Sequence, residues 1–133
     1  MKAFIQIFFI LMPFCCLVTN CKAQTKLAGK TYIAETGATC KDGIGMLFHY
    51  QLLKFDKDSV TIAQRVRAEV TPERKALYEH LYDNLDKKYK WEMHNNVLII
   101  KDCKDLNKLV IKGTKIIGKD SEMKPIIFEE KIK

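Results

Sequence analysis

Five cysteines are the most reactive side chains in this 133-residue chain, and three of them lie close together near its start. The stretch CCLVTNCKAQ, residues 15–24, holds Cys15, Cys16 and Cys21. Four kinds of chemistry would use such a group: a disulfide cluster, a metal site, a lipid attachment point, or a peptide that is removed on export. The residues that precede the stretch favour the last two.

The first residues have the composition of an export signal. Lys2 supplies a positive charge, and residues 3–18 follow as an apolar run that only Gln6 and Pro13 interrupt. A charged start, an apolar segment and small residues at the end are typical of a secretory signal peptide, whereas a membrane-spanning helix needs about 20 apolar residues. We therefore predict a signal peptide over residues 1–23 and one domain over residues 24–133.

The end of the signal has two interpretations. Cleavage before Gln24 is favoured, because small residues stand one and three places before it. Alternatively, residues 17–21 resemble a bacterial lipobox, with Asn20 where that motif has Gly, Ala or Ser, and Cys21 would carry a lipid that tethers the domain to a membrane. Either processing removes the first two cysteines. The predicted localisation is periplasmic or secreted, with lipid anchoring to the envelope as the alternative.

Cys40 and Cys103 are the cysteines that remain after cleavage before Gln24, an even pair in an oxidising compartment. They are predicted to form a disulfide, which would contribute about 4 kcal/mol of stability through chain entropy. With His80 and His94 they could supply four zinc ligands on paper, but neither C-x-x-C nor H-x-x-x-H spacing occurs. We predict no metal and no cofactor.

Catalytic signatures are absent from the sequence. Ser59 and Ser121 are the only serines, and neither lies in a G-x-S-x-G motif. H-E-x-x-H, a phosphate-binding glycine loop and an EF-hand loop are also missing. Glu129 and Glu130 are adjacent in a predicted strand, so their side chains point to opposite faces and cannot act as a pair. We predict that the protein is not an enzyme.

The charge of the chain is positive but scattered. The net charge is +7, and the loss of Lys2 and Lys22 with the signal would leave +5. Nucleic-acid binding would need a basic stripe, so we expect no nucleic-acid partner. An anionic membrane surface fits an exported basic protein better, although the membrane attachment that we predict is only through a lipid on Cys21.

Apolar and polar residues alternate in short segments, which is typical of antiparallel strands. The expected strands and hairpins cover residues 30–36, 46–55, 59–70, 88–101, 109–118 and 123–132. Residues 36–45 contain three glycines and are predicted to form a loop that carries Cys40. Gly113-Thr114 suits a type II′ turn inside the hairpin 109–118.

The hairpin of residues 46–70 is the first candidate for a binding surface. Pairing of Phe55 with Val60 would fix its register. That register places three polar side chains on one otherwise apolar face: His49, Gln51 and Gln64. Burial of these three side chains in a dry core would cost free energy unless each is hydrogen-bonded. Three arrangements avoid that cost: a network of hydrogen bonds among them, exposure to solvent at the end of a barrel, or a cavity in which they orient a ligand.

The hairpin of residues 88–101 turns at residues 95–96, where Asn-Asn fits a type I′ turn. Its register pairs Trp91 with Ile100 and places Tyr89 on the same face. These two aromatic residues are predicted to form one wall of the ligand site, and an aromatic plug of the core is the alternative.

A helix is expected over residues 72–85. Thr71 suits the N-cap and Pro72 the first helical position. Leu77, Leu81 and Leu85 recur at a spacing of four, with two tyrosines beside them. The helix is expected to pack on the sheet as a lid; a partner-binding helix would instead expose its tyrosine side, Tyr78 and Tyr82.

These elements predict a mainly β fold: a small antiparallel up-and-down barrel or curled sheet of about eight strands, with one amphipathic helix. Short meandering strands after an export signal, entered through LAGKTY, resemble the lipocalin-like small barrels of bacterial envelopes. Lipocalins open with Gly-x-Trp, and this chain has Gly29-Lys30-Thr31-Tyr32. The resemblance covers residues 27–132 and implies either a barrel that binds a small apolar molecule or an envelope protein without a ligand.

Two functional hypotheses follow. The first is a non-enzymatic, exported domain with a small apolar or amphipathic ligand in the barrel interior. The ligand-binding residues expected for it are His49, Gln51, Gln64, Tyr89 and Trp91. The second is a protein-interaction or inhibitor module that uses the helix at residues 72–85, with a protein partner that the sequence does not identify.

Overall fold

The computed structural model describes residues 26–41, 43 and 45–132. The predicted signal peptide over residues 1–23 and the alternative lipid site Cys21 lie outside the described residues. Within the described residues, no helix is long and apolar enough to cross a membrane.

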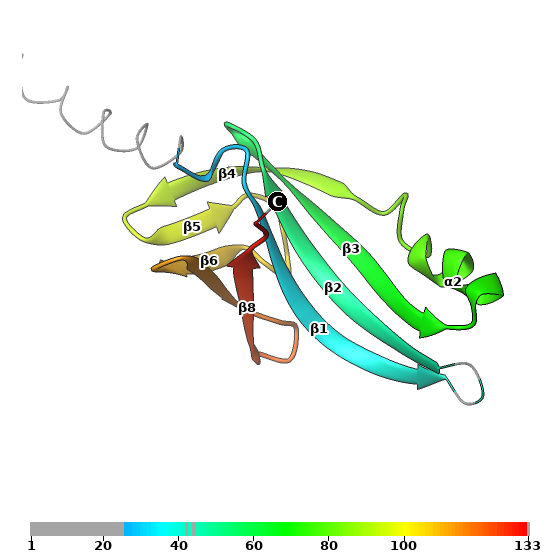
Figure 1. Ribbon diagram of the computed structural model, residues 1–133. Helices are drawn as coiled ribbons and strands as arrows, with labels where there is room; N and C mark the ends of the chain where they lie inside the picture. The colour runs from blue at the N-terminus through cyan, green and yellow to red at the C-terminus, as the bar shows by residue number, and fades with distance from the viewer. Residues whose placement is uncertain (1–25, 42, 44, 133) are drawn as a thin grey trace, which may run out of the picture.

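Eight antiparallel strands form a closed barrel in which each strand pairs with its neighbours in the chain and β8 returns to β1 (Figure 1). The fold is therefore the mainly β, up-and-down barrel that the alternating pattern predicted. The strands are β1 (Thr31–Lys41), β2 (Gly45–Phe55), β3 (Ser59–Val70), β4 (Lys87–His94), β5 (Val97–Ile100), β6 (Lys108–Lys112), β7 (Lys115–Lys119) and β8 (Pro125–Glu130).

The predicted hairpin registers are confirmed. Phe55 pairs with Val60 in β2–β3, and Trp91 pairs with Ile100 in β4–β5. Register holds because a shift by one residue would turn every buried side chain to the solvent face. Gly113 has a φ of 61°, as the first position of a type II′ turn requires.

One turn type was predicted wrongly. A type I′ turn needs positive φ at both central residues, whereas only Asn95 of the pair 95–96 has it, at 56°. The β4–β5 register is nevertheless as predicted, because the alternation of buried and exposed residues along the two strands also fixes it.

The prediction of a loop over residues 36–45 is wrong for most of its length. β1 continues to Lys41 and β2 begins at Gly45, and residues 37–41 of β1 pair with residues 45–49 of β2. A register shift between Glu35 and Gly37 accommodates one extra residue as a bulge. Glycines therefore mark a bulge and a tight hairpin end here.

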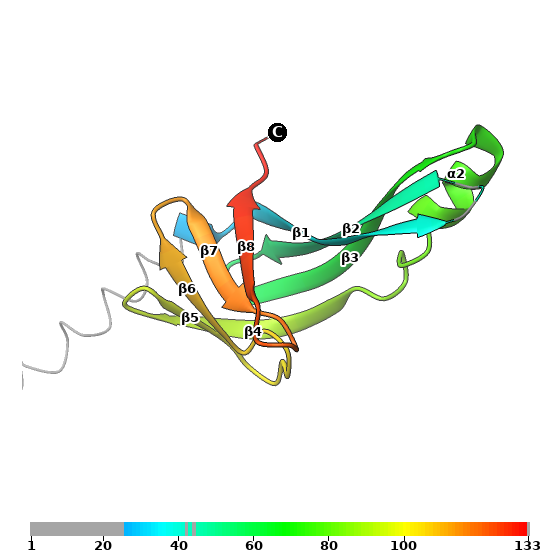
Figure 2. The ribbon, with the colours of Figure 1, turned by 90° about the horizontal axis from the view of Figure 1, so that it is seen from below.

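The outer parts of three strands extend beyond the barrel. β8 pairs with β1 only at Tyr32 and Ile33, and β4 pairs with β3 only over residues 59–62. The remaining residues of β1, β2 and β3, about 34–41, 45–52 and 63–70, continue as a three-stranded sheet, which we call the arm (Figures 1 and 2).

The helix α2 (Pro72–Glu79) lies against the arm beside β3 (Figure 2). It ends earlier than expected, and residues 80–84 form turns. Tyr78 and Tyr82 pack on a small buried cluster of the arm formed by Leu47, Val66 and Ala68. The tyrosine side therefore packs on the sheet as expected for a lid, and Tyr78 and Tyr82 are half-buried rather than exposed.

The leucines of this segment face solvent instead. Leu77, Leu81 and Leu85 are 69%, 51% and 58% exposed. The buried cluster of the arm next to α2 has only three residues, Leu47, Val66 and Ala68, and the side chains that pack on it from this segment are the two tyrosines.

The barrel interior is filled by side chains. One cluster of buried residues contains Leu27, Tyr32, Ala34, Leu53, Phe55, Val60, Trp91, Met93, Leu98, Ile100, Cys103, Leu106, Leu109, Ile116, Ile126 and Phe128. The rings of Tyr32, Phe55 and Trp91 contact one another edge to face, with centroids 5.8 and 5.4 Å apart. A small barrel of eight strands has an interior that side chains of this size can fill.

The predicted disulfide is not formed. Cys40 is exposed near the outer end of β1, and Cys103 is buried in the barrel cluster, each as a free thiol. A disulfide requires Cα atoms within about 7 Å. The sequence could not show that Cys40 lies in the arm, because residues 36–45, which contain it, were interpreted as a loop.

Candidate functional site

A strip of polar side chains separates the buried cluster of the barrel from the small cluster under α2. Gln51 pairs with Gln64, and His49 pairs with Val66. These residues lie on the same face as Leu53 and Ile62, so the strip continues the inner wall of the barrel into the arm. Such a border between two apolar clusters is where polar groups can keep contact with solvent.

A hollow of about 410 Å³ lies over this strip. It opens to solvent between the arm and the segment that follows α2. Its lining residues are Thr36, Gly37, Ala38, Thr39, His49, Tyr50, Gln51, Gln64, Arg65 and Tyr82. The hollow is therefore lined by residues with hydroxyl, amide, imidazole and guanidinium groups, among them two tyrosines.

A second hollow of about 220 Å³ adjoins the first, because Gln51 and Gln64 line both. Its other lining residues are mostly apolar: Ile62, Leu85, Lys87, Tyr89, Cys103, Asp105 and Leu106. We call the two hollows together the groove. Burial raises the pKa of Tyr89, and the nearby Cys103 and Asp105 raise it further, so its hydroxyl stays protonated and can donate a hydrogen bond.

Polar contacts inside the groove hold His49 but leave the amides free. Thr39 Oγ1 and His49 Nε2 are 2.5 Å apart, and the ring of Tyr82 lies 6.4 Å from the imidazole, centroid to centroid. No hydrogen bond joins the side chain of Gln51 or Gln64 to another described residue. Both amides therefore keep donors and acceptors available for a bound molecule.

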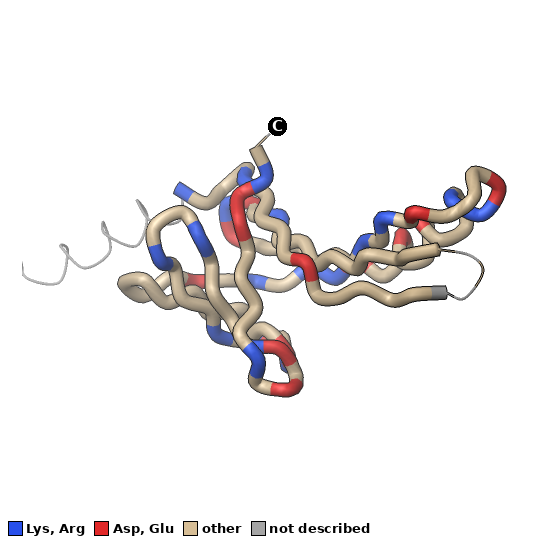
Figure 3. Tube along the Cα trace, turned by 60° about the horizontal axis from the view of Figure 1, so that its bottom comes forward, with Lys and Arg blue, Asp and Glu red and all other residues tan. Residues whose placement is uncertain are grey.

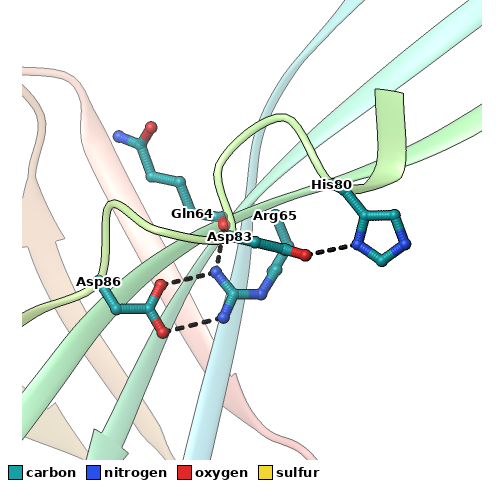
Figure 4. Close-up of polar contacts among 5 residues, drawn as sticks. All are labelled: Gln64, Arg65, His80, Asp83 and Asp86. Atoms are coloured by element: carbon teal, nitrogen blue, oxygen red, sulfur yellow. Dashed lines mark hydrogen bonds and ion pairs between the residues drawn. The ribbon is translucent and has the colours of Figure 1, made fainter. Parts of the chain in front are cut away.

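An ion pair fixes the segment that closes the groove. Arg65 of β3 donates two hydrogen bonds to the carboxylate of Asp86, at 2.7 and 2.9 Å, and a third to the carbonyl of Gln64 at 2.6 Å (Figure 4). The hydrogen bonds from Arg65 lower the pKa of Asp86. A hydrogen bond between His80 and Asp83 orders the preceding turn (Figure 4). This part of the groove wall is therefore tied to the arm.

Four of the five residues that the sequence proposed for ligand binding line the groove, and one does not. His49, Gln51, Gln64 and Tyr89 meet there. Trp91 is 3% exposed in the barrel cluster, and its Nε1 donates to the carbonyl of Ser59 at 3.1 Å. Trp91 is therefore packed in the core, as the alternative interpretation of this residue expected, and is not part of a ligand site wall.

Several groove residues escaped the sequence analysis. Thr39 lay in the segment interpreted as a loop, and Tyr82 and Leu85 were placed on the predicted helix. Cys103 and Leu106 belong to the connection between β5 and β6, which shows no alternation. Only tertiary packing brings these segments to the inner face of the arm.

Three charged residues of both signs line the groove: Arg65, Lys87 and Asp105. Lys and Arg segments alternate with Asp and Glu segments over both barrel and arm (Figure 3). In the part of the chain that the structure describes, no three His, Cys, Asp or Glu side chains are placed to hold a metal ion. The groove is lined mainly by neutral polar groups at one end and apolar groups at the other.

Comparison with known proteins adds no family to this description: no protein family matches the chain, and neither the curated proteins nor the solved structures include a match.

Proposed function

We propose that the chain is a non-enzymatic, exported domain that binds a small amphipathic ligand in the groove between the barrel and α2. Export rests on the sequence of residues 1–23, with a periplasmic or secreted location, or a lipid anchor at Cys21. The observation that carries the ligand is the meeting of His49, Gln51 and Gln64 with apolar side chains in one open groove.

The two ends of the groove suit the two parts of an amphipathic molecule. Ile62, Leu85 and Leu106 would bury an apolar part and remove its surface from water. Gln51 and Gln64 would bond a neutral polar part. A binding site of this kind needs only a few polar groups to orient a ligand that apolar walls hold.

The proposal places the ligand outside the barrel interior. Side chains fill that interior, and the groove lies where the inner wall continues into the arm. The closed eight-stranded barrel is consistent with the lipocalin-like resemblance, and we keep that resemblance as part of the proposal. The buried Tyr32 stands one residue beyond the position that the Gly-x-Trp motif gives to tryptophan.

Thiol protection tests the proposal with the amphipathic dye anilinonaphthalene sulfonate. Cys103 lines the groove, whereas Cys40 does not, so the second thiol is an internal reference. Bound dye should slow alkylation of Cys103 and leave that of Cys40 unchanged. Gln51→Leu with Gln64→Leu should weaken the protection about tenfold if the two amides bind the dye's polar group.

A control and a second measurement complete this test. Asn84→Leu removes an exposed amide outside the groove, and it should leave the protection of Cys103 as in the wild type. Organic extraction of protein purified from its native compartment, followed by mass spectrometry, should recover the natural ligand. Equal protection of both thiols, together with an empty extract, would reject the proposal.

The exposed leucines favour a second candidate, the protein-interaction or inhibitor module. Leu77, Leu81 and Leu85 form the largest exposed apolar group near α2, and such patches mark interaction sites. This function predicts a defined partner that binds wild type and loses affinity with Leu77→Ser and Leu81→Ser. Retained binding by that double variant would count against it.

A further inference from the structure

The outer wall of the barrel carries a row of β-branched residues on strands β6, β7 and β8. Val110 of β6 pairs with Ile117 of β7, which pairs with Ile127 of β8. Their sequence neighbours Leu109, Ile116 and Ile126 are buried in the core, so alternation turns the row outward. Ile127 is 47% exposed, and the other two members of the row are half-buried.

A methionine extends this row into the turn between β7 and β8. Met123 is 68% exposed and has a φ of 64°, a backbone conformation that a long side chain rarely adopts. The turn imposes it, because Asp120 Oδ1 accepts the backbone N–H groups of Glu122 and Lys124. The methionine side chain is thus held out in solvent by a well-bonded turn.

Three of these four apolar residues, but not Ile127, line a hollow of about 640 Å³ together with three lysines. Val110, Ile117 and Met123 line it together with Lys104, Lys108, Lys119, Asp105, Asp120, Asn107, Gly118 and Ser121. We call the four apolar residues, Val110, Ile117, Met123 and Ile127, with the three lysines, Lys104, Lys108 and Lys119, the outer patch.

The lysines of the outer patch keep their charge available. Lys104, Lys108 and Lys119 form no ion pair with any described residue, whereas Lys115 and Lys124 beside them pair with Glu129 and Glu122. Two aspartates also line the hollow, and the carboxylate of one, Asp120, is bonded to the backbone of its turn. Positive charge therefore exceeds negative charge around an apolar floor.

We propose that the outer patch docks on an anionic lipid surface. Met123 and Ile127 would enter the interfacial region, where apolar surface leaves water, and the three lysines would contact headgroup phosphates. Charge complementarity selects this occupant, since unpaired lysines around an apolar surface would repel one another in an interface between two copies of the chain.

Methionine methyl resonances test the proposal within one molecule. The exported protein, labelled with ¹³C-methyl methionine, is mixed with vesicles of equal parts phosphatidylcholine and phosphatidylglycerol that carry a paramagnetic lipid. Broadening of the Met123 signal is expected, while Met93 in the core and Met46 in the arm stay sharp. Broadening of Met46 without Met123 would overturn the proposal, because it would place the arm on the lipid.

Vesicle sedimentation measures the charge dependence. Lys108→Gln with Lys119→Gln should weaken binding about thirtyfold, as expected for two lysines near an anionic surface. The matched control is Lys57→Gln with Lys90→Gln, which removes the same charge from exposed sites outside the patch. Similar losses for both pairs, or equal binding to vesicles of phosphatidylcholine alone, would show that the patch is not the docking surface.

Apolar variants separate the outer patch from the exposed leucines. Met123→Asn should lower vesicle binding without unfolding the turn, because asparagine tolerates positive φ. Leu77→Ser with Leu81→Ser should leave vesicle binding unchanged. Vesicle binding that is lost with the leucine variant and kept with Met123→Asn would instead place the lipid contact at α2. If sedimentation equilibrium shows a dimer of the wild type that Met123→Asn abolishes, the outer patch binds a second copy of the chain.

Discussion

At the scale of single residues, the groove wall contains an ion pair in which Arg65 donates two hydrogen bonds to Asp86. Both side chains are about 30% exposed, so water screens the pair and its contribution to stability is modest. Its role is positional, because it joins β3 to the segment that carries Leu85 and Lys87 into the groove.

Asp86→Asn should lower the free energy of unfolding by about 1 kcal/mol at neutral pH. Arg65 lowers the pKa of the Asp86 carboxyl in the folded protein. The stability that the ion pair adds is therefore complete above the unfolded-state pKa of Asp86, near 3.8, and disappears as the pH falls through its pKa in the folded state. Urea unfolding at neutral and strongly acid pH measures this difference. Glu69→Gln, which breaks an exposed pair with Arg67, should change stability by less than about 0.5 kcal/mol.

The two thiols should behave as independent groups. Without reducing agent, the mature chain should keep both thiol hydrogens, and alkylation should modify Cys40 much faster than Cys103, since only the first is exposed. Intact mass spectrometry after timed alkylation measures both properties. A mass lower by two hydrogens, with neither thiol reactive, would instead support the disulfide between Cys40 and Cys103 that the sequence predicted.

At the scale of elements, α2 shows how one helix can bury the less apolar of its two candidate sides. Its tyrosines contact the small cluster of the arm, and its leucines remain outside. Tyrosine can bury its ring and keep its hydroxyl in water, which suits a shallow contact at the edge of a three-stranded sheet.

Tyr82→Ala should therefore destabilise the protein more than Leu81→Ala. Removal of a ring packed on Val66 and Ala68 is expected to cost about 2 kcal/mol, whereas removal of an exposed leucine should cost about 0.5 kcal/mol or less. Thermal or urea unfolding of both variants gives the comparison. A larger loss for the leucine variant would mean that the leucine side is buried in solution.

At the scale of the whole molecule, the protein has two regions that bury unequal numbers of apolar residues. The barrel holds sixteen buried residues in one cluster, and the arm with α2 holds three. Opening of a region with little buried apolar surface requires less free energy than global unfolding. The groove lies at the border of these regions, so a ligand there would contact both.

Hydrogen exchange should resolve the two regions. Backbone amides of β2 and β3 in the arm, such as Leu47 and Val66, should exchange faster than paired amides of the barrel, such as Leu98 and Ile116. Exchange followed by mass spectrometry of peptides measures the difference. Uniform protection of arm and barrel would contradict it and indicate a single cooperative unit.

Much of the fold was predictable because the strands alternate strictly and their turns are short. The pairs Phe55–Val60 and Trp91–Ile100 follow from sequence alone, since alternation and turn length leave one register that buries the apolar face. The polar strip of His49, Gln51 and Gln64 followed from the same register, which is why most of the proposed ligand residues lie in the groove.

Tertiary structure alone decided where these strands leave the barrel and what covers them. The alternation of β1 is interrupted by a bulge and small residues, so the sequence could not show that residues 36–41 extend the sheet. Only packing chose the tyrosine side of α2, buried Trp91 and kept Cys40 away from Cys103. Local pattern determines which faces of a strand are apolar, whereas long-range contacts determine which apolar face finds a partner, because burial depends on residues far away in the chain.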